Sequence, residues 1–401
     1  MDYGGARVLA AAFRAGGVKA RVVPPSDAFS NSLGGKCTSG DECYPTKITL
    51  GDFLAILDRG DVKREEAAFF MATADGPCRF GQYAGFMRKT LDELGYNDVP
   101  IFSLTSRTAY HDLGDGFERN AWRGIVAADI LRKFLHMTRP YEINHGDTDK
   151  VFEDEINHGD TDKVFEESVE EVCRVVDGGS HLVEVLKTAR NRFNAIPIRN
   201  KGSFPLIAVV GEIFCRLNTF SNQDLIRKIE QHGAECWLTG VSEWILYTNA
   251  DEIRRLKEKG LFLSKKMLKA AAKRYILKKD EHKLLAPFIN DLKGREECPV
   301  NNLLKLSLPY LPWYGSLGEM TLSAAGAIYA HKKDCAGVVD ISSFACMNEI
   351  VAESVFQKIS RDLENFPIKV FYFDGTSQNL DCDIEIFLEL ARNYSSKRAK
   401  V

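Results

Sequence analysis

Three cysteines occupy similar settings, each in a short loop that comes directly before a predicted helix. Cys43 lies in the segment TSGDECYPTK, Cys78 in MATADGPCRFGQ and Cys346 in VDISSFACMNE. A helix N-terminus offers unpaired backbone N–H groups and the positive end of the helix dipole. We therefore expect lowered thiol pKa values at these positions, which would favour the thiolate form that binds metals.

A thiolate-ligated iron–sulfur cluster is a compact anion and suits the same setting. Three cysteines would leave one iron of a [4Fe–4S] cluster open to a substrate oxygen, a water or a bridging sulfide. We hypothesise that Cys43, Cys78 and Cys346 are the metal ligands and cofactor-binding residues of one such cluster. Spacing along the chain does not bring three loops together, so the hypothesis depends on the fold.

Each cysteine taken alone has a simpler explanation, because cytosolic cysteines are most often small buried apolar residues. Zinc sites favour close pairs such as C-x2-C, and the sequence has none. Cys37 and Cys43 are the nearest pair, so Cys37 is a reserve ligand. The other cysteines lie in apolar or helical segments and are expected to be structural: Cys173, Cys215, Cys236, Cys298, Cys335 and Cys382.

Short apolar segments alternate with amphipathic ones along much of the chain. The predicted strands are 19–23, 67–72, 99–104, 204–210, 234–239, 336–341 and 368–373. The predicted helices are 8–15, 82–94, 222–232, a long helical stretch at 253–292, one from 348, and 384–394. This alternation predicts parallel sheets with helices on both faces. In such sheets, ligands bind beyond the carboxyl ends of the strands.

We predict an α/β fold of two Rossmann/flavodoxin-like parallel-sheet domains with helical insertions. The N-terminal domain comprises residues 1–200 and includes a helical, charged segment at about 117–200. The C-terminal domain comprises residues 201–401, with a helical insertion at about 250–295. We expect the basic part of that insertion, residues 257–283, to be a solvated face whose charges are balanced by Glu and Asp.

The amino-acid composition argues against some classes of function. The 401 residues include 53 Lys and Arg against 56 Asp and Glu, a net charge of −3 that does not favour nucleic-acid binding. Hydrophobic content of 45% and charged content of 27% match a globular chain. No apolar run approaches the roughly 18 residues of a membrane span. We expect no membrane partner and, without a secretory signal, a cytoplasmic location that keeps the ten cysteines reduced.

One segment is duplicated: residues 142–153 and 155–166 both read EINHGDTDKVFE. Two units are too few for a solenoid. A tandem duplication in a polar loop explains the repeat better, because surface loops tolerate insertions. The doubled His145/His158 and Asp147/Asp160 are a weak metal signal, since they belong to one copied segment.

Eight segments together carry a family resemblance. They are residues 38–54, 69–83, 121–142, 209–222, 233–244, 318–331, 338–351 and 370–376, among them FFMATADGPCRFGQY and VVDISSFACMNEIV. In this order they make nearly the whole chain resemble the 2-hydroxyacyl-CoA dehydratase/benzoyl-CoA reductase superfamily. The narrower resemblance is to the cluster-bearing C-terminal region of acyl-CoA dehydratase activase-related proteins. The family's cluster cysteines correspond to Cys43, Cys78 and Cys346.

The resemblance implies an iron–sulfur protein that accepts low-potential electrons from an ATP-hydrolysing activase of the sugar kinase/Hsp70/actin fold. It implies a [4Fe–4S] cluster, which in a related group is part of a double-cubane cluster. The implied chemistry is radical dehydration of a 2-hydroxyacyl-CoA, a lyase reaction, or reduction of a small molecule. An acyl-CoA substrate and a sister dehydratase-like subunit are further implied partners.

The sequence departs from the family after the last cysteine, where Met347-Asn348-Glu349 replaces Met-Pro-Gly. It also lacks a phosphate-binding loop of the G-x-x-x-x-G-K-[ST] type. The alternative function is therefore a non-catalytic scaffold or partner subunit of an activase/dehydratase complex, without a functional cluster. Catalytic residues are not identified, and the sequence leaves open whether the chain is an enzyme.

Four further polar residues have two readings each. Glu212 and Glu319 are expected at the ends of elements, where they cap a loop or line a cleft. Arg79 can offset the charge of a cluster beside Cys78, and Arg216 can bind an acyl or phosphate group. The alternative for both arginines is a solvated surface position.

Overall fold

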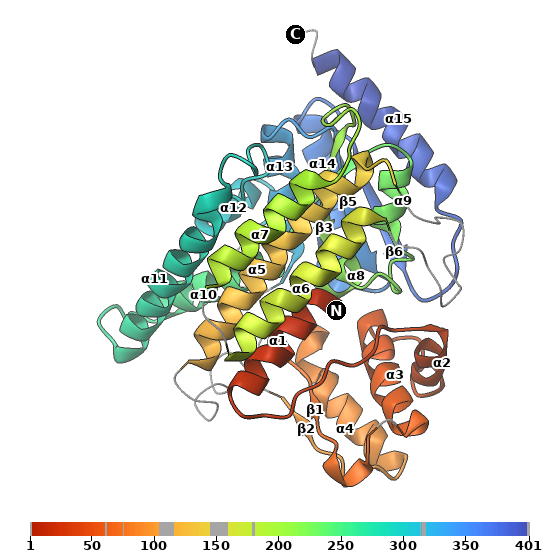
Figure 1. The fold of residues 1–401 in the computed structure, drawn as a ribbon, viewed down its shortest axis with the longest axis vertical. Coiled ribbons are helices and arrows are strands. Elements are labelled where there is room, and N and C mark those ends of the chain that lie inside the picture. Colours follow the sequence, from red (N-terminus) through yellow and green to blue (C-terminus); the bar gives the residue numbers. More distant parts are fainter. Residues whose placement is uncertain are drawn as a thin grey trace.

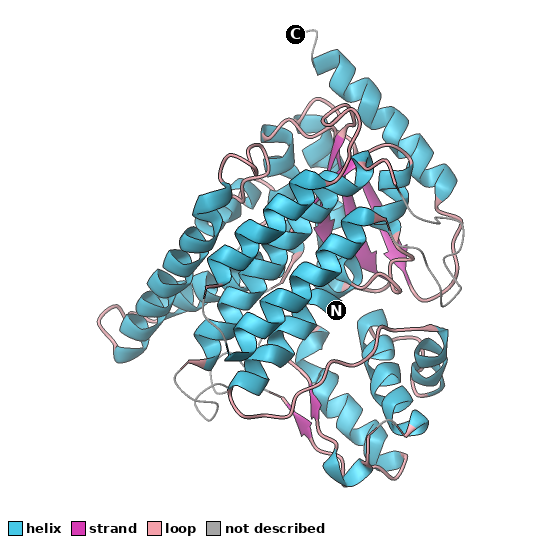
Figure 2. Ribbon diagram, in the orientation of Figure 1, coloured by secondary structure: helices cyan, strands magenta, loops and turns pink. Residues whose placement is uncertain are grey.

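The computed structural model describes residues 2–60, 62–74, 76–103, 116–144, 159–178, 181–312, 314 and 318–398. Helices predominate, and the strands form one four-stranded and one two-stranded parallel sheet (Figure 2). The predicted α/β class is therefore confirmed. None of the helices described has the length and apolar character needed to cross a membrane.

The larger sheet is built from the C-terminal half of the chain. Its strands are β3 (Leu206–Gly211), β4 (Glu235–Leu238), β5 (Gly337–Ser343) and β6 (Ile368–Phe373). They pair in the order β4-β3-β5-β6, and all pairs are parallel. In order of appearance this is 2-1-3-4, which matches four strands of the doubly wound order 2-1-3-4-5.

Helices cover both faces of this sheet because side chains alternate along β3. Ile207 and Val209 pack in one core with α9 (Leu225–Gln231) and α15 (Asp381–Arg398). Ala208 and Val210 pack in another core with α13 (Met320–Lys332) and α14 (Met347–Asp362). The remaining helices here are α8 (Ile213–Leu217), α10 (Val241–Glu258), α11 (Lys265–Leu285), α12 (Val300–Ser307) and η5 (Ala286–Phe288).

A layer of long helices lies across the middle of the molecule (Figure 1). It contains α1 (Tyr3–Ala15), α5 (Phe117–Thr138), α6 (Asp160–Gly178) and α7 (Leu182–Ala195), with η4 (Arg139–Tyr141) after α5. Its apolar core also includes Leu277, Leu284 and Phe288 from α11 and η5. Trp122 donates its indole N–H to the Leu277 carbonyl at 3.0 Å. This core therefore draws on residues from both sides of position 200.

The N-terminal unit contains α2 (Ala28–Lys36), α3 (Tyr44–Arg59), η1 (Arg64–Glu66), η2 (Arg79–Gln82) and α4 (Tyr83–Glu93). Its sheet is small: β1 (Phe69–Phe70) pairs in parallel with β2 (Ile101–Phe102). The predicted strand at 19–23 is wrong, since that segment has no regular secondary structure. Pro24 and Pro25 follow it, and proline cannot donate to a strand ladder.

The structure also bears on the predicted long helical stretch and on the duplicated segment. The helical stretch predicted at 253–292 is divided between α10 and α11, which a turn at residues 259–264 separates. In the duplicated segment, residues 145–158 lie outside the described residues, and with them His145, His158 and Asp147. In the described part, Glu142 of the first copy accepts hydrogen bonds from the N–H and hydroxyl of Thr161 of the second copy, at 2.9 and 2.6 Å.

Candidate functional site

Each of the three predicted cysteines is the N-cap residue of a helix. Cys43 precedes α3, Cys78 precedes η2 and Cys346 precedes α14. Pro45 in the first turn of α3 favours a helix start. Ala345 has a φ of 60°, a left-handed conformation that turns the chain from β5 into α14. The predicted position before a helix is thus confirmed for all three.

Cys346 lies where the strand order of the large sheet reverses. It follows the carboxyl end of β5, which pairs with β3. Glu212 follows the carboxyl end of β3 directly. Successive connections leave these two strands in opposite directions, since β4 lies beyond β3 and β6 lies beyond β5. Such a point opens a crevice in which doubly wound sheets bind ligands.

The N-terminal unit meets the sheet at the same edge. Tyr44 and Ile48 of α3 belong to the core that contains inward-facing residues of β3, β5 and β6. The Asn31 amide donates to the carbonyl of Gly375, just after β6, at 3.5 Å. The Asn218 amide, just after α8, donates to the Ser26 hydroxyl at 3.2 Å. Cys43, at the start of α3, is therefore carried to the carboxyl edge of the sheet.

Arg79 connects the loops of all three cysteines. It follows Cys78 in the chain, and its Nη1 donates to the carbonyl of Asp41 at 2.7 Å. Its Nη2 donates to the carbonyl of Ala345, the residue before Cys346. A guanidinium has donors in a fixed fork, so it can hold two carbonyls at once. Arg79 is exposed, as the surface interpretation predicted, and both terminal nitrogens of its guanidinium are hydrogen-bonded to the neighbouring loops.

The electrostatic environment of the thiols differs from the sequence-based expectation. Burial raises the pKa of Cys78 to about 11, the N–H of Phe80 partly offsets this, and Glu319 and Cys43 add to it. Burial likewise raises the pKa of Cys346, and the nearby Glu349 raises it further. For Cys78 and Cys346 the helix N-terminus is thus outweighed by desolvation and by neighbouring carboxyl groups. Thiolates here need a bound cation, since metal coordination deprotonates a thiol outright.

Glu212 and Glu319 lie in the same environment as the cysteines. Glu212 caps α8, accepting from the N–H groups of Phe214 at 2.9 Å and Cys215 at 2.7 Å. Glu319 accepts from the N–H of Ile213 at 2.8 Å. Burial raises the pKa of both, that of Glu319 to about 8. The interpretation of both residues as caps is therefore confirmed.

Sequence reasoning missed a second pair of buried carboxyl groups behind the cysteine loops. Asp340 in β5 accepts from the Ser342 hydroxyl at 2.5 Å, and Glu349 in α14 accepts from the Ser323 hydroxyl at 3.2 Å. Burial raises the pKa of Asp340 to about 6 and that of Glu349 well above its usual value. The signal was present in the sequence, because Asp340 interrupts an otherwise apolar strand.

Arg216 is also buried in this region and is not a surface arginine. Its Nη1 donates to the carbonyl of Gly211 at 3.0 Å, while its Nε has no hydrogen-bond partner. Its charge lowers the pKa of Glu212, Glu319 and Asp340. Arg216 thus supplies positive charge under the carboxyl edge of the sheet.

The three cysteine-bearing loops can be compared with what an iron–sulfur cluster requires of its ligands. Within the described ranges, no three His, Cys, Asp or Glu side chains are grouped closely enough to hold one metal ion. A [4Fe–4S] cluster distributes its thiolates over separate irons, so its ligands need not converge on one point. Arg79 connects the three cysteine-bearing loops, and Cys43 is near enough to Cys78 to raise its pKa. The raised thiol pKa values oppose loading unless iron displaces the protons.

The other cysteines divide as follows. Cys37 ends α2 and packs against the core of the N-terminal unit, and burial raises its pKa. Cys215, Cys236 and Cys335 are buried, as expected of structural residues, whereas Cys382 at the start of α15 is exposed. All ten cysteines lie in described parts of the chain, and all are free thiols.

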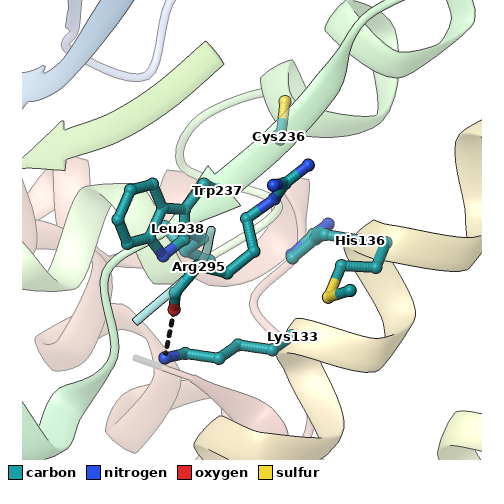
Figure 3. Close-up of a pocket in the computed structure, with 7 residues that line it drawn as sticks. Lys133, His136, Cys236, Trp237, Leu238 and Arg295 are labelled. Atoms are coloured by element: carbon teal, nitrogen blue, oxygen red, sulfur yellow. Dashed lines mark hydrogen bonds between the residues drawn. The ribbon is translucent and has the colours of Figure 1, made fainter. Parts of the chain in front are cut away.

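Two cavities lie away from the cysteine loops. The smaller has a volume of about 10 Å³, room for a single water. Figure 3 shows its lining, where Lys133 donates to the Arg295 carbonyl. It is lined by Lys133, His136, Met137, Cys236, Trp237, Leu238 and Arg295. The larger, of about 470 Å³, opens at the amino ends of β3 and β4, beside Leu206 and Glu235. That edge is opposite to the one at which parallel sheets bind ligands.

No family model matches this chain, and no curated protein matches it. Function is therefore inferred from the geometry at the carboxyl edge of the sheet and from the motifs of the sequence.

Proposed function

We propose that the chain is an iron–sulfur protein that accepts low-potential electrons for use in 2-hydroxyacyl-CoA dehydration or a related small-molecule reduction. Its [4Fe–4S] cluster, alone or as part of a double cubane, would be held by Cys43, Cys78 and Cys346. The observation that carries the proposal is the Arg79 bridge, which joins the loops of three cysteines that are distant in sequence. The family resemblance of the motifs supports it independently.

The protein's own groups have definable roles in this proposal. Arg79 positions the cysteine loops by holding the carbonyls of Asp41 and Ala345. The backbone N–H groups of Phe80 and Glu349 lower the pKa of Cys78 and Cys346 and so stabilise negative charge at these two sulfurs. Glu319, with its pKa raised to about 8, holds a proton at neutral pH. The bound cluster would supply one-electron transfer and Lewis acidity, which no side chain of this region provides.

The proposal extends to architecture, partners and location. It includes a second Rossmann/flavodoxin-like domain around β1 and β2, facing the large sheet across the cysteine loops. Electrons would come from an ATP-hydrolysing activase, with an acyl-CoA substrate and a sister dehydratase-like subunit as further partners. A cytoplasmic location would keep the ten free thiols reduced.

One observation favours a second function, that of a scaffold or partner subunit without a functional cluster. Cys78 and Cys346 have raised thiol pKa values and carboxyl-bearing neighbours. Buried, protonated cysteines behave as small apolar residues and need no metal. In that case Arg79 would serve only to fix the packing of the N-terminal unit on the sheet.

Electron paramagnetic resonance of the anaerobically purified chain tests the first function against the second. We expect a reduced-cluster signal after addition of titanium(III) citrate, a low-potential one-electron reductant. The signal should be absent from a Cys78→Ser variant and retained in Cys382→Ser, whose cysteine is exposed. A wild-type chain that stays silent and colourless, yet as stable as the triple cysteine-to-alanine variant, would leave only the scaffold function.

A further inference from the structure

The α10–α11 hairpin is strongly basic, although the chain as a whole has a small negative net charge. Residues 257–283, all of which the structure describes, include ten Lys or Arg and three Asp or Glu, hence a net charge of +7 (10 − 3). The whole chain has a net charge of −3. The expectation that acidic residues balance this stretch is therefore wrong.

The turn between the two helices exposes large apolar side chains. Phe262 and Leu263 are 59% and 93% exposed, and Leu261 before them is also exposed. Two hydrogen bonds order the turn. The N–H of Leu261 donates to the carbonyl of Leu256 at 2.9 Å. The Ser264 hydroxyl caps α11 by accepting from the N–H of Met267 at 3.1 Å. The apolar tip is thus a fixed feature, at the free end of the hairpin (Figure 1).

The two sides of α11 differ in what they contact. Met267 and Ala270 pack against Ile253 and Leu256 of α10, and Leu277 packs into the core of the helical layer. On the opposite side, Leu268 and Tyr275 are exposed among lysines. Of these lysines, Lys265 and Lys266 have no carboxylate partner within the described residues. The outward side of the hairpin is therefore both basic and apolar.

The kind of basic residue distinguishes between two classes of occupant. The exposed cations are all lysines: Lys257, Lys259, Lys265, Lys266, Lys269, Lys278, Lys279 and Lys283. Lysine is depleted at protein–protein interfaces, where arginine is enriched. A fluid anionic surface needs no fixed geometry and attracts lysines near its plane. An inserted apolar tip beside a basic patch provides the two signals that stable membrane association requires.

We propose that the α10–α11 hairpin docks on an anionic lipid surface, with the side chains of Leu261, Phe262 and Leu263 inserted and the lysines of α11 against the headgroups. Association is peripheral and reversible. It weakens at high salt, because the screening length shortens. It is independent of the proposed iron–sulfur function, since the hairpin tip lies outside the cysteine loops.

Co-sedimentation of the full chain with lipid vesicles tests the proposal. The chain should bind vesicles of phosphatidylcholine mixed with phosphatidylserine. Its binding to vesicles of phosphatidylcholine alone should be at least tenfold weaker. Lys265→Ala combined with Lys266→Ala should weaken binding roughly thirtyfold, because each lysine near such a surface contributes about a fivefold factor. Phe262→Asp combined with Leu263→Asp should abolish it.

Two controls separate docking from unspecific effects. Ile386→Asp combined with Leu390→Asp removes two similarly exposed apolar residues from α15 and should leave binding unchanged. In a Phe262→Trp variant, tryptophan emission should shift to shorter wavelength with the anionic vesicles and not with soluble polyglutamate. Failure of the wild-type chain to sediment with anionic vesicles overturns the proposal, and retention on polyglutamate would then assign the hairpin to an acidic polypeptide. Equal binding by the aspartate tip variant also overturns it.

Discussion

Arg79 shows how one side chain can determine the geometry of three loops. Its guanidinium donates to carbonyls in the Cys43 and Cys346 loops, and Arg79 itself directly follows Cys78 in the chain. Charge alone would be supplied equally by a lysine. Two carbonyls at fixed positions, however, require the planar fork of arginine.

We predict that Arg79→Ala lowers the iron retained by the anaerobically reconstituted chain, and that Arg79→Lys does not restore it. The reason is that an ammonium on a flexible stem replaces the fork by a point charge. The control is Arg361→Ala, which removes an exposed arginine of α14. Iron retention equal to wild type in Arg79→Ala would show that the bridge does not position the cysteines.

Glu319 allows a prediction about stability and pH. Its pKa is raised to about 8 by burial, whereas the unfolded chain binds that proton only below the ordinary glutamate pKa near 4.5. The folded state therefore holds one more proton between these pH values. Its contribution to stability is complete below about pH 4.5 and is lost as pH rises through about 8, at up to about 1.4 kcal/mol per pH unit.

Glu319→Gln should make this decline shallower, because the amide keeps the acceptor for Ile213 N–H and cannot ionise. Urea unfolding at several pH values between 5 and 8 measures the slope. Glu93→Gln, at an exposed position of α4, is the control and should follow the wild-type curve. An unchanged slope in Glu319→Gln would mean that Glu319 is ionised in the folded protein.

The position of a cysteine before a helix could be predicted from the sequence, whereas its thiol pKa could not. A cysteine before a helix start is readable from local sequence, since Pro45 and the apolar periodicity of α3 indicate where that helix begins. The raised pKa values of Cys78 and Cys346 are not, because they arise from burial and from Glu319 and Glu349, which are brought near by the fold. Local dipoles are sequence properties, whereas desolvation is a tertiary one.

At the scale of elements, the α2–α3 pair positions Cys43. The two helices cross where both lack side chains: a Cβ on Gly34 would lie 2.0 Å from the Lys47 carbonyl oxygen, and one on Gly51 would lie 1.9 Å from that of Ser30. Backbone cannot yield as a flexible side chain can. The crossing therefore depends on glycine at both positions.

Gly51→Ala is predicted to destabilise the protein by about 1–3 kcal/mol, the usual effect of overpacking. Denaturant unfolding measures it. Gly85→Ala is the matched control, because a Cβ there meets nothing within 4 Å in α4. There alanine should be neutral or stabilising by up to about 1 kcal/mol, through its higher helix propensity. Equal effects of the two substitutions would contradict the close crossing.

The elements of the C-terminal half were more predictable than those of the N-terminal half. The apolar runs 204–210 and 368–373 became β3 and β6 nearly as expected, because continuous apolar runs of this length are typical of strands in parallel sheets. In the N-terminal unit, β1 and β2 contain two residues each. Pairing over so short a length is set by packing of α3 and α4, which no local pattern reveals.

At the scale of the whole molecule, the carboxyl edge of the large sheet is where the two halves of the chain meet. Contacts of Asn31 with Gly375 and of Ser26 with Asn218 place the N-terminal unit there. The parallel arrangement of the strands was predicted from the α/β pattern, whereas their order β4-β3-β5-β6 was not. The docking of α2 and α3 on it was not, since it depends on side chains far apart in sequence.

The iron and acid-labile sulfide content of the anaerobically reconstituted chain shows whether Cys43, Cys78 and Cys346 together hold one cluster. We predict about four irons and about four sulfides per wild-type chain. Substitution of any of the three cysteines by serine should greatly reduce both, and Cys335→Ser, at a buried cysteine of the sheet core, should not. A wild-type chain without iron, or serine variants that keep the full content, would show that these three cysteines do not hold a cluster together.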